Sequence, residues 1–220
     1  MYTSFRVQNF RCFEDLRIDD LARVNLIAGK NNTGKTSVLE AIMLRTQALP
    51  SFFLPSGQIQ PPSELAHKRF LLDALQPLEP RLIDMTFSAD IIHCDIGANT
   101  SIPLPAMGEG MNRVASLVLA IGSASGGVIC IDEIENGLHY SIMTDVWRAI
   151  AKAARAFDVQ IFATTHSLEC IRAAHEAFSQ DEIYDFRYHR LDRKKTGKIE
   201  AVTFNRDMLQ TAANANFEVR

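Results

Sequence analysis

The chain contains 220 residues, with a mass of 24.6 kDa and a formal net charge of -3. A chain of this length can bury a core of its own, so we expect residues 1–220 to form one domain. Its four cysteines form no CxxC pair and no Cys/His cluster, which argues against a disulfide framework and a zinc site. The weakly negative charge excludes a global attraction to nucleic acid, so any such binding requires a local basic patch.

The opening residues, MYTSFRVQNF, lack the basic and apolar regions of a secretory signal peptide. No apolar run in the sequence approaches the ~20 residues that a membrane-spanning helix needs. We therefore expect a cytoplasmic protein with no membrane partner.

The first predicted elements are strands. Alternating apolar residues over 5–18 predict one or two antiparallel strands, and the apolar run over 24–29 predicts a buried strand that stops at a glycine. Apolar residues at helical spacing predict a helix over 37–49. Six of the eight prolines then fall between positions 50 and 80. We expect a short irregular insertion or lid over 51–103, with one short helix near 63–75 and strands at 81–87 and 90–96.

Strands and helices alternate through the rest of the chain. Strands are predicted at 128–131, 159–165, 183–191 and 198–204, and helices at 112–124, 140–157 and 167–178, with a polar helix at the end. This order predicts an α/β fold whose mostly parallel sheet is covered by helices on both faces, with an antiparallel N-terminal β subdomain. Ligands of such sheets bind at the carboxyl ends of the strands.

The segment from Gly29 to Thr36, GKNNTGKT, fits the P-loop pattern GxxxxGK[ST] between a predicted strand and a predicted helix. Backbone N–H groups of such a loop and the following helix N-terminus hold a polyphosphate. Lys35 would bridge the β- and γ-phosphates of ATP, and the Thr36 hydroxyl would bind Mg²⁺. The alternative is a chance match in a glycine-containing turn. The predicted nucleotide-binding residues are Gly29, Asn31, Asn32, Thr33, Gly34, Lys35, Thr36 and Ser37.

Two further strand ends carry polar residues. Asp132 and Glu133 follow the apolar strand VICI, where Asp132 can hold Mg²⁺ and Glu133 can polarise an attacking water. His166 follows another strand and would contact a γ-phosphate at the same edge. Without the P-loop, we would interpret the two acids as a solvated strand end and the histidine as a structural residue. With it, we predict that Lys35, Glu133 and His166 are catalytic.

These motifs together resemble the ABC-type ATPases. The segments FRVQNFRCFEDL, GKNNTGKTSVLEAI, GEGMNR, VICIDEIENGLHYS and FATTHSLECI carry the resemblance, which covers about 1–50 and 104–180. They are most similar to the chromosome-maintenance and recombination branch, and within it to small bacterial AAA-domain proteins related to the overcoming-lysogenization-defect ATPases. The resemblance implies a P-loop NTPase fold and an ATP-dependent homodimer.

The resemblance also implies roles for three further segments. Gly108 and Gly110 stand where the family places the signature loop that contacts the partner subunit's nucleotide. Between them Glu109 adds a negative charge, which a γ-phosphate would repel unless the side chain points away. The segment 135–139 resembles the D-loop, and His166 resembles the switch histidine. A transporter-type signature has a serine at the position of Gly108, so a transporter motor is disfavoured.

The leading functional hypothesis is an ATPase whose two nucleotide-bound subunits clamp together and act on DNA or on a partner effector, in DNA repair or phage defence. The alternative is a low-turnover, nucleotide-dependent switch that controls a partner effector or toxin. We identify no nuclease signature in the sequence. A basic turn at 190–198 reads either as a solvated hairpin or as a contact to a phosphate backbone through Arg193, Lys194, Lys195 and Lys198.

Overall fold

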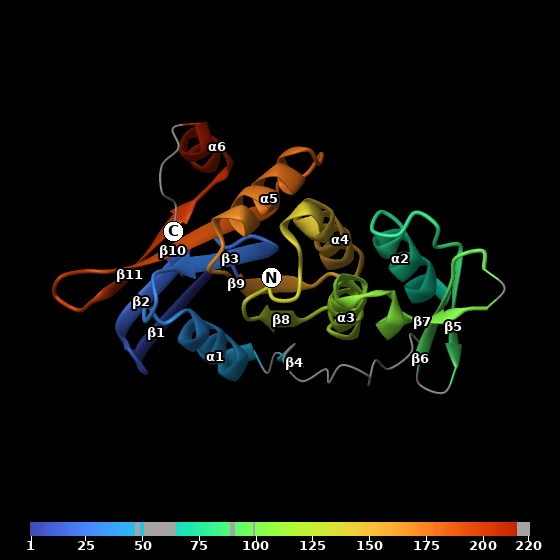
Figure 1. The fold of residues 1–220 in the computed structure, drawn as a ribbon. Coiled ribbons are helices and arrows are strands. Elements are labelled where there is room, and N and C mark those ends of the chain that lie inside the picture. Colours follow the sequence, from blue (N-terminus) through green and yellow to red (C-terminus); the bar gives the residue numbers. More distant parts are fainter. Residues whose placement is uncertain (47–48, 51–64, 89–90, 99, 215–220) are drawn as a thin grey trace.

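The computed structural model describes residues 1–46, 49–50, 65–88, 91–98 and 100–214 (Figure 1). Its central sheet has six strands in the order β11-β10-β3-β9-β8-β4. All neighbours in this sheet are parallel except β10 and β11. The strands are β3 (Val24–Gly29), β4 (Leu49–Pro50), β8 (Val128–Ile131), β9 (Gln160–Thr164), β10 (Phe186–Arg193) and β11 (Ile199–Phe204).

Helices cover both faces of this sheet, as the sequence predicts (Figure 1). One face packs against α1 (Lys35–Thr46), and the other packs against α3 (Glu109–Ser123), α4 (Met143–Ala156) and α5 (Leu168–Ser179). The last helix, α6 (Arg206–Asn214), contacts α5 and β11. The α1 helix ends at Thr46 rather than at the predicted 49, because Leu49 already pairs with β8 as part of β4.

Strand β3 is buried on both faces of the sheet, which is why its sequence is a nearly continuous apolar run. Val24, Leu26 and Ala28 face the cluster that includes α3, α4 and α5, whereas Ile27 faces the cluster around α1. Successive side chains of a strand point to opposite faces, so a strand covered on both faces must be apolar at nearly every position.

The N-terminal strands form the predicted antiparallel subdomain. Strand β1 (Ser4–Phe10) pairs with β2 (Phe13–Asp19) in a two-stranded sheet. Buried Phe13 and Leu16 of β2 pack in the same cluster as Leu39 of α1. The hairpin therefore lies on the face of the central sheet that carries α1.

Residues 65–103 are more regular than the predicted insertion. They form α2 (Leu65–Leu75) and the antiparallel strands β5 (Asp84–Ser88), β6 (Ile91–Asp95) and β7 (Ile102–Pro103). A 3-10 helix, η2 (Leu104–Met107), follows directly. Leu71 and Leu75 of α2 are buried in the core beside α3. The expected short helix and strands are confirmed. The expected irregular character is wrong for the described residues from 65 to 103, because their prolines lie at element ends and in turns. Residues 51–64 lie outside the described residues.

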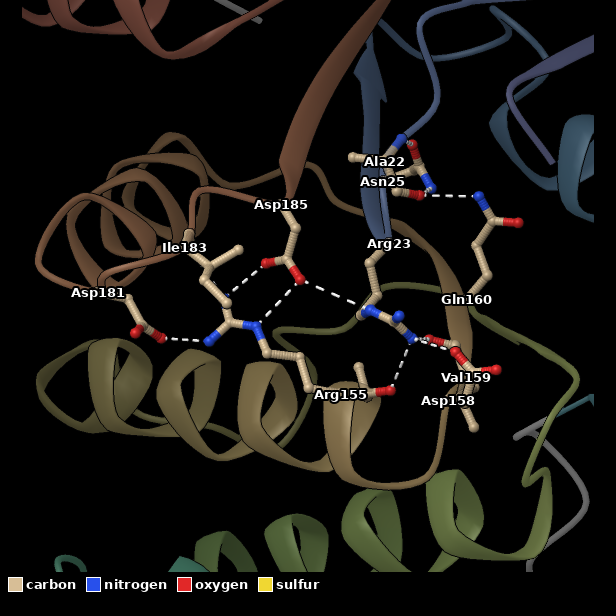
Figure 2. Close-up of polar contacts among 11 residues, drawn as sticks. Ala22, Arg23, Asn25, Arg155, Asp158, Val159, Gln160, Asp181, Ile183 and Asp185 are labelled. Atoms are coloured by element: carbon tan, nitrogen blue, oxygen red, sulfur yellow. Dashed lines mark hydrogen bonds and ion pairs between the residues drawn. The ribbon is translucent and has the colours of Figure 1, made fainter. Parts of the chain in front are cut away.

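A charged network joins the amino ends of three central strands (Figure 2). Arg155 of α4 binds Asp181 at 2.5 Å and Asp185 at 2.6 Å. Arg23, just before β3, binds Asp185 at 3.6 Å and Asp158 at 3.0 Å. The hydrogen bond from Arg155 lowers the pKa of Asp181. This network ties α4 to the starts of β3, β9 and β10.

None of the helices in the described ranges combines the length and the apolar character that crossing a bilayer requires.

Candidate functional site

The P-loop turns between β3 and α1 at the carboxyl edge of the sheet. Gly34 has a φ of +87°, and a Cβ placed there would lie 2.6 Å from both Cys12 Sγ and Phe13 Cζ. A side chain at position 34 would therefore be strained and would also collide with the turn between β1 and β2. The hairpin thus holds the loop from one side, while Thr33 donates its hydroxyl hydrogen to the Lys30 carbonyl at 2.8 Å.

Lys35 lies beneath this loop and is only 6% exposed. Its Nζ donates to the carbonyl oxygens of Gly29 at 2.8 Å and Lys30 at 3.3 Å. Burial lowers the pKa of the Lys35 ammonium, and the nearby carboxylates of Asp132 and Glu133 act in the opposite direction. The site therefore holds a desolvated cation against backbone carbonyls, a position from which it can bind an anion that enters the loop.

Asp132 follows β8 and reaches the start of α1. Its Oδ2 accepts a hydrogen bond from the Thr36 hydroxyl at 3.1 Å, and its Oδ1 is bonded to the Thr164 hydroxyl. Mg²⁺ is commonly bound by one or two protein oxygens together with substrate phosphates and waters. The residues present fit that ion. Within the described ranges, no group of three or more His, Cys, Asp and Glu side chains could hold a metal ion alone.

Glu133 is fixed by its neighbours in an unusual backbone conformation. Its φ is +47°, and its N–H donates to Thr164 Oγ1 at 2.8 Å. The carboxylate accepts a hydrogen bond from Asn136 Nδ2 at 2.6 Å, and its other oxygen lies 3.7 Å from His166 Nε2. Non-glycine residues at positive φ are costly and cluster at functional sites. The Glu133 carboxylate is oriented yet remains 46% exposed, so a water molecule can reach it.

His166 follows β9 and faces the P-loop. Its backbone N–H donates to Glu135 Oε1 at 2.7 Å, which holds the residue at the edge of the sheet. A cavity of about 540 Å³ opens between His166 and the loop. It is lined by Cys12, Asn31, Asn32, Gly34, Lys35, Thr36, Ser37, His166 and Arg193. This volume lies within the range of small-molecule and cofactor sites.

The structure brings the P-loop, the acids after β8 and His166 to one edge of the sheet. Of the predicted site residues, the cavity lining includes Asn31, Asn32, Gly34, Lys35, Thr36, Ser37 and His166, and it does not include Gly29, Thr33, Asp132, Glu133, Gly108 or Gly110. A Cβ at Gly137 would lie 3.0 Å from Glu109 Oε1, so the Glu109 carboxylate turns toward the segment 135–139 of its own chain. That Gly108 and Gly110 of one subunit contact the nucleotide of the other subunit stays a prediction.

Sequence reasoning missed three contributors. Thr164 supports both acids, and Asn136 orients Glu133. Arg193, which the sequence placed in a basic hairpin, lines the cavity and donates from Nη2 to the Asn32 carbonyl at 2.6 Å. A polar residue at a strand end could have signalled Thr164, but no local pattern distinguishes Arg193 from its neighbouring lysines.

Two protein families match parts of the chain. Residues 52–172, more than half of the chain, match the family described as "AAA domain, putative AbiEii toxin, Type IV TA system". Residues 1–93 match a family described as "AAA ATPase domain".

Two curated proteins share short segments with the chain. An uncharacterized protein of Methanocaldococcus jannaschii is 41% identical over 54 residues, which are 24% of this chain and 25% of that protein. An ATP/GTP phosphatase of Helicobacter pylori is 43% identical over 42 residues, which are 19% of this chain and 11% of that protein. The aligned segments therefore span a quarter or less of each relative.

Two solved structures share the fold. An SMC head bound to the C-terminal winged-helix domain of ScpA has a TM-score of 0.64 at 10% identity, covering 95% of this chain and 99% of that chain. The SMC head domain from Thermotoga maritima has a TM-score of 0.61 at 11% identity, covering 92% and 98%. The narrower resemblance to overcoming-lysogenization-defect ATPases stays a prediction. The chain has the ABC-type P-loop ATPase fold of SMC heads, and it belongs to the AAA family that its residues 52–172 match.

Proposed function

We propose that the protein binds ATP in the P-loop cavity and hydrolyses it to ADP and phosphate. The loop offers backbone N–H groups and the N-terminus of α1, and Lys35 supplies a buried cation beneath them. Together they favour the β- and γ-phosphates of a nucleotide. Thr36 and Asp132 lie close enough to share Mg²⁺, which when bound neutralises developing negative charge on the phosphates.

Glu133 is the proposed residue that orients the attacking water. The observation that carries this role is the fixed carboxylate, which is held by Asn136 and lies 3.7 Å from His166, a residue that lines the cavity. A carboxylate can accept a hydrogen bond from water and turn its lone pair toward phosphorus. His166 lines the cavity, and we propose that it contacts the γ-phosphate oxygens.

The test is ATP binding and phosphate release by Glu133→Gln, with Glu14→Gln on β2 as the matched control. The amide keeps the shape of Glu133 but removes the charge that orients water, so hydrolysis should fall by about 100-fold or more while ATP still binds. Glu14 is exposed and lies on the N-terminal hairpin, so its variant should hydrolyse ATP like the parent. Parent-like hydrolysis by Glu133→Gln would assign the catalytic carboxylate elsewhere, with Glu135 as the next candidate.

ATP is proposed to join two subunits. Gly108 and Gly110 begin α3 outside the cavity of their own chain, and nothing lies within 4 Å of a Cβ placed at Gly108. Glu109 turns toward Gly137, which removes its charge from the open face of this loop. A second helix N-terminus, supplied by a two-fold partner, can therefore cover a γ-phosphate that the P-loop leaves open.

Mixing two inactive variants tests this shared site. Lys35→Ala removes the P-loop cation, and Gly110→Asp places an anion at the start of α3. If sites are shared, a mixed dimer contains one site with both lesions and one intact site, so ATPase activity should return on mixing. A monomer that is active at every dilution would rule the shared site out.

A second candidate is a low-turnover switch whose ATP occupancy controls an effector or toxin. The matched family description, which names a toxin–antitoxin system, favours it. The rate of steady-state turnover, with and without DNA, separates the two, because a clamp acting on DNA should be stimulated by it. In the hairpin, Lys194 and Lys198 pair with Glu200 at 3.4 and 3.3 Å, which leaves fewer cations for a DNA backbone than the sequence suggests.

A further inference from the structure

Strand β10 extends beyond the end of β3 and over the P-loop. The last parallel pair between these strands joins Leu191 to Gly29, where β3 ends, but β10 continues to Arg193. Residues two apart in a strand share a face. Arg193 therefore lies on the same face as Leu191, which packs in the cluster around α1. The register of the sheet thus carries an arginine from near the end of the chain to the phosphate loop.

The contacts of Arg193 differ from those of its neighbours. Its Nη2 donates to the Asn32 carbonyl at 2.6 Å, and the residue lines the cavity. Lys194 and Lys198 instead pair with Glu200, outside the cavity lining. Within the described residues Arg193 forms no ion pair, and a guanidinium has five N–H donors. Donors therefore remain for an anion in the cavity.

The strand order separates Arg193 from Glu133 and His166. Glu133 follows β8 and His166 follows β9, whereas Arg193 ends β10 on the opposite side of β3 and its loop. The γ-phosphate must meet Glu133 for hydrolysis. A cation on the other side of the loop therefore lies away from the position that the γ-phosphate would take.

We propose that Arg193 is a binding residue for the α- and β-phosphates of the nucleotide. The proposal rests on the proposed ATP site and adds a ligand that the P-loop pattern does not contain. A planar guanidinium can donate two parallel hydrogen bonds to a phosphate while a third N–H remains on Asn32. The contact anchors the nucleotide and takes no part in the attack on the γ-phosphate.

Titration calorimetry with ATP and with ADP, in the presence of Mg²⁺, tests this assignment in the full chain. Arg193→Ala should lower the affinity for ATP and the affinity for ADP by a similar factor of about 10 or more, the scale of one hydrogen bond between charged groups. Lys195→Ala is the matched control, because Lys195 is an exposed cation of the same hairpin that does not line the cavity. Its affinities should stay parent-like. In steady-state hydrolysis, Arg193→Ala should raise KM by the same factor and leave kcat unchanged.

Other outcomes would overturn the proposal. Unchanged affinity in Arg193→Ala would do so. A loss of affinity confined to ATP, together with a reduced kcat, would also do so, because it would place the arginine at the γ-phosphate.

Pyrophosphate should also bind more weakly to Arg193→Ala, whereas a parallel loss of adenosine binding would indicate a nucleoside contact. A lower midpoint of urea unfolding without ligand would indicate that Arg193 orders the loop instead. If the parent protein binds no ATP, the proposed function fails as well. If the parent binds ATP and Arg193→Ala binds it equally well, this assignment alone fails.

Discussion

The two edges of the central sheet use charged residues in opposite ways. At the amino edge, Arg155 and Arg23 share the carboxylate of Asp185, and each also binds a second acid (Figure 2). At the carboxyl edge, the Lys35 ammonium is bonded to backbone carbonyls, and the Glu133 carboxylate is 46% exposed. Paired charges at one edge hold helices and strands in place. Charges kept out of close ion pairs at the other edge are available to a ligand.

Chain direction explains this division. In parallel strands the carboxyl ends meet at one edge, where loops lead into helix N-termini and backbone N–H groups point outward. The amino ends meet at the other edge, where Arg23, Asp158 and Asp185 immediately precede or adjoin their strands. We therefore expect changes at the carboxyl edge to affect ligand binding and changes at the amino edge to affect stability.

Lys35→Ala should give the largest effect on function and a small effect on stability. Loss of the buried cation should weaken ATP binding by about 100-fold, since more than one charged hydrogen bond to phosphate disappears. The free energy of unfolding should stay equal or rise, because burial disfavours the charged Lys35 in the folded protein. Calorimetry and urea unfolding measure the two quantities. Normal ATP binding by Lys35→Ala would contradict the claim that charges at the carboxyl edge serve ligand binding.

Arg155→Ala should show the reverse pattern. The change leaves Asp181 and Asp185 without their shared guanidinium, so we expect a loss of about 2 to 4 kcal/mol in the free energy of unfolding. Arg148→Ala is the matched control on the same helix. Its ion pair with Asp145 is more exposed, so its loss should cost about 1 kcal/mol or less. Equal losses in urea unfolding, or weakened ATP binding in folded Arg155→Ala, would contradict the division.

The pH dependence of stability should reveal a smaller effect from His189. This histidine is fully buried, bonded to Asn25 and Thr203, and burial lowers its pKa from 6.5 to about 3. The folded protein therefore binds this proton less well than the unfolded chain, and stability should fall as the pH drops from 6.5 toward 3. His189→Gln should flatten that fall, whereas His93→Gln on β6 should leave it intact. An identical acid dependence in all three proteins would show that His189 becomes protonated without unfolding.

Much of the fold follows from local patterns in the sequence. The run VNLIAG and the motif after it predict the buried strand, the loop and the helix, because each depends on residues close in the chain. Residues 65–103 were harder to predict, since six prolines nearby suggested irregular structure. The burial of Leu71 and Leu75 depends on packing against α3, which lies later in the chain.

Some residues of the site could also be predicted from the sequence, and others could not. Lys35, Asp132 and His166 could be predicted because each lies at the end of a predicted strand or its following loop. Arg193 could not be assigned to the cavity, because its place depends on how far β10 extends past β3. The direction of Glu109 could not be predicted either, since it reflects the approach of the segment around Gly137.

A crystal structure with a non-hydrolysable ATP analogue and Mg²⁺ would test the central claim most directly. We predict that Lys35 Nζ leaves the Gly29 and Lys30 carbonyls to bind the β- and γ-phosphates, with Thr36 and Asp132 beside the metal ion. The γ-phosphate should lie between the P-loop and Glu133. The charged network around Arg155 should keep its contacts. A nucleotide bound away from Lys35, or a γ-phosphate out of reach of a water held by Glu133, would contradict the account.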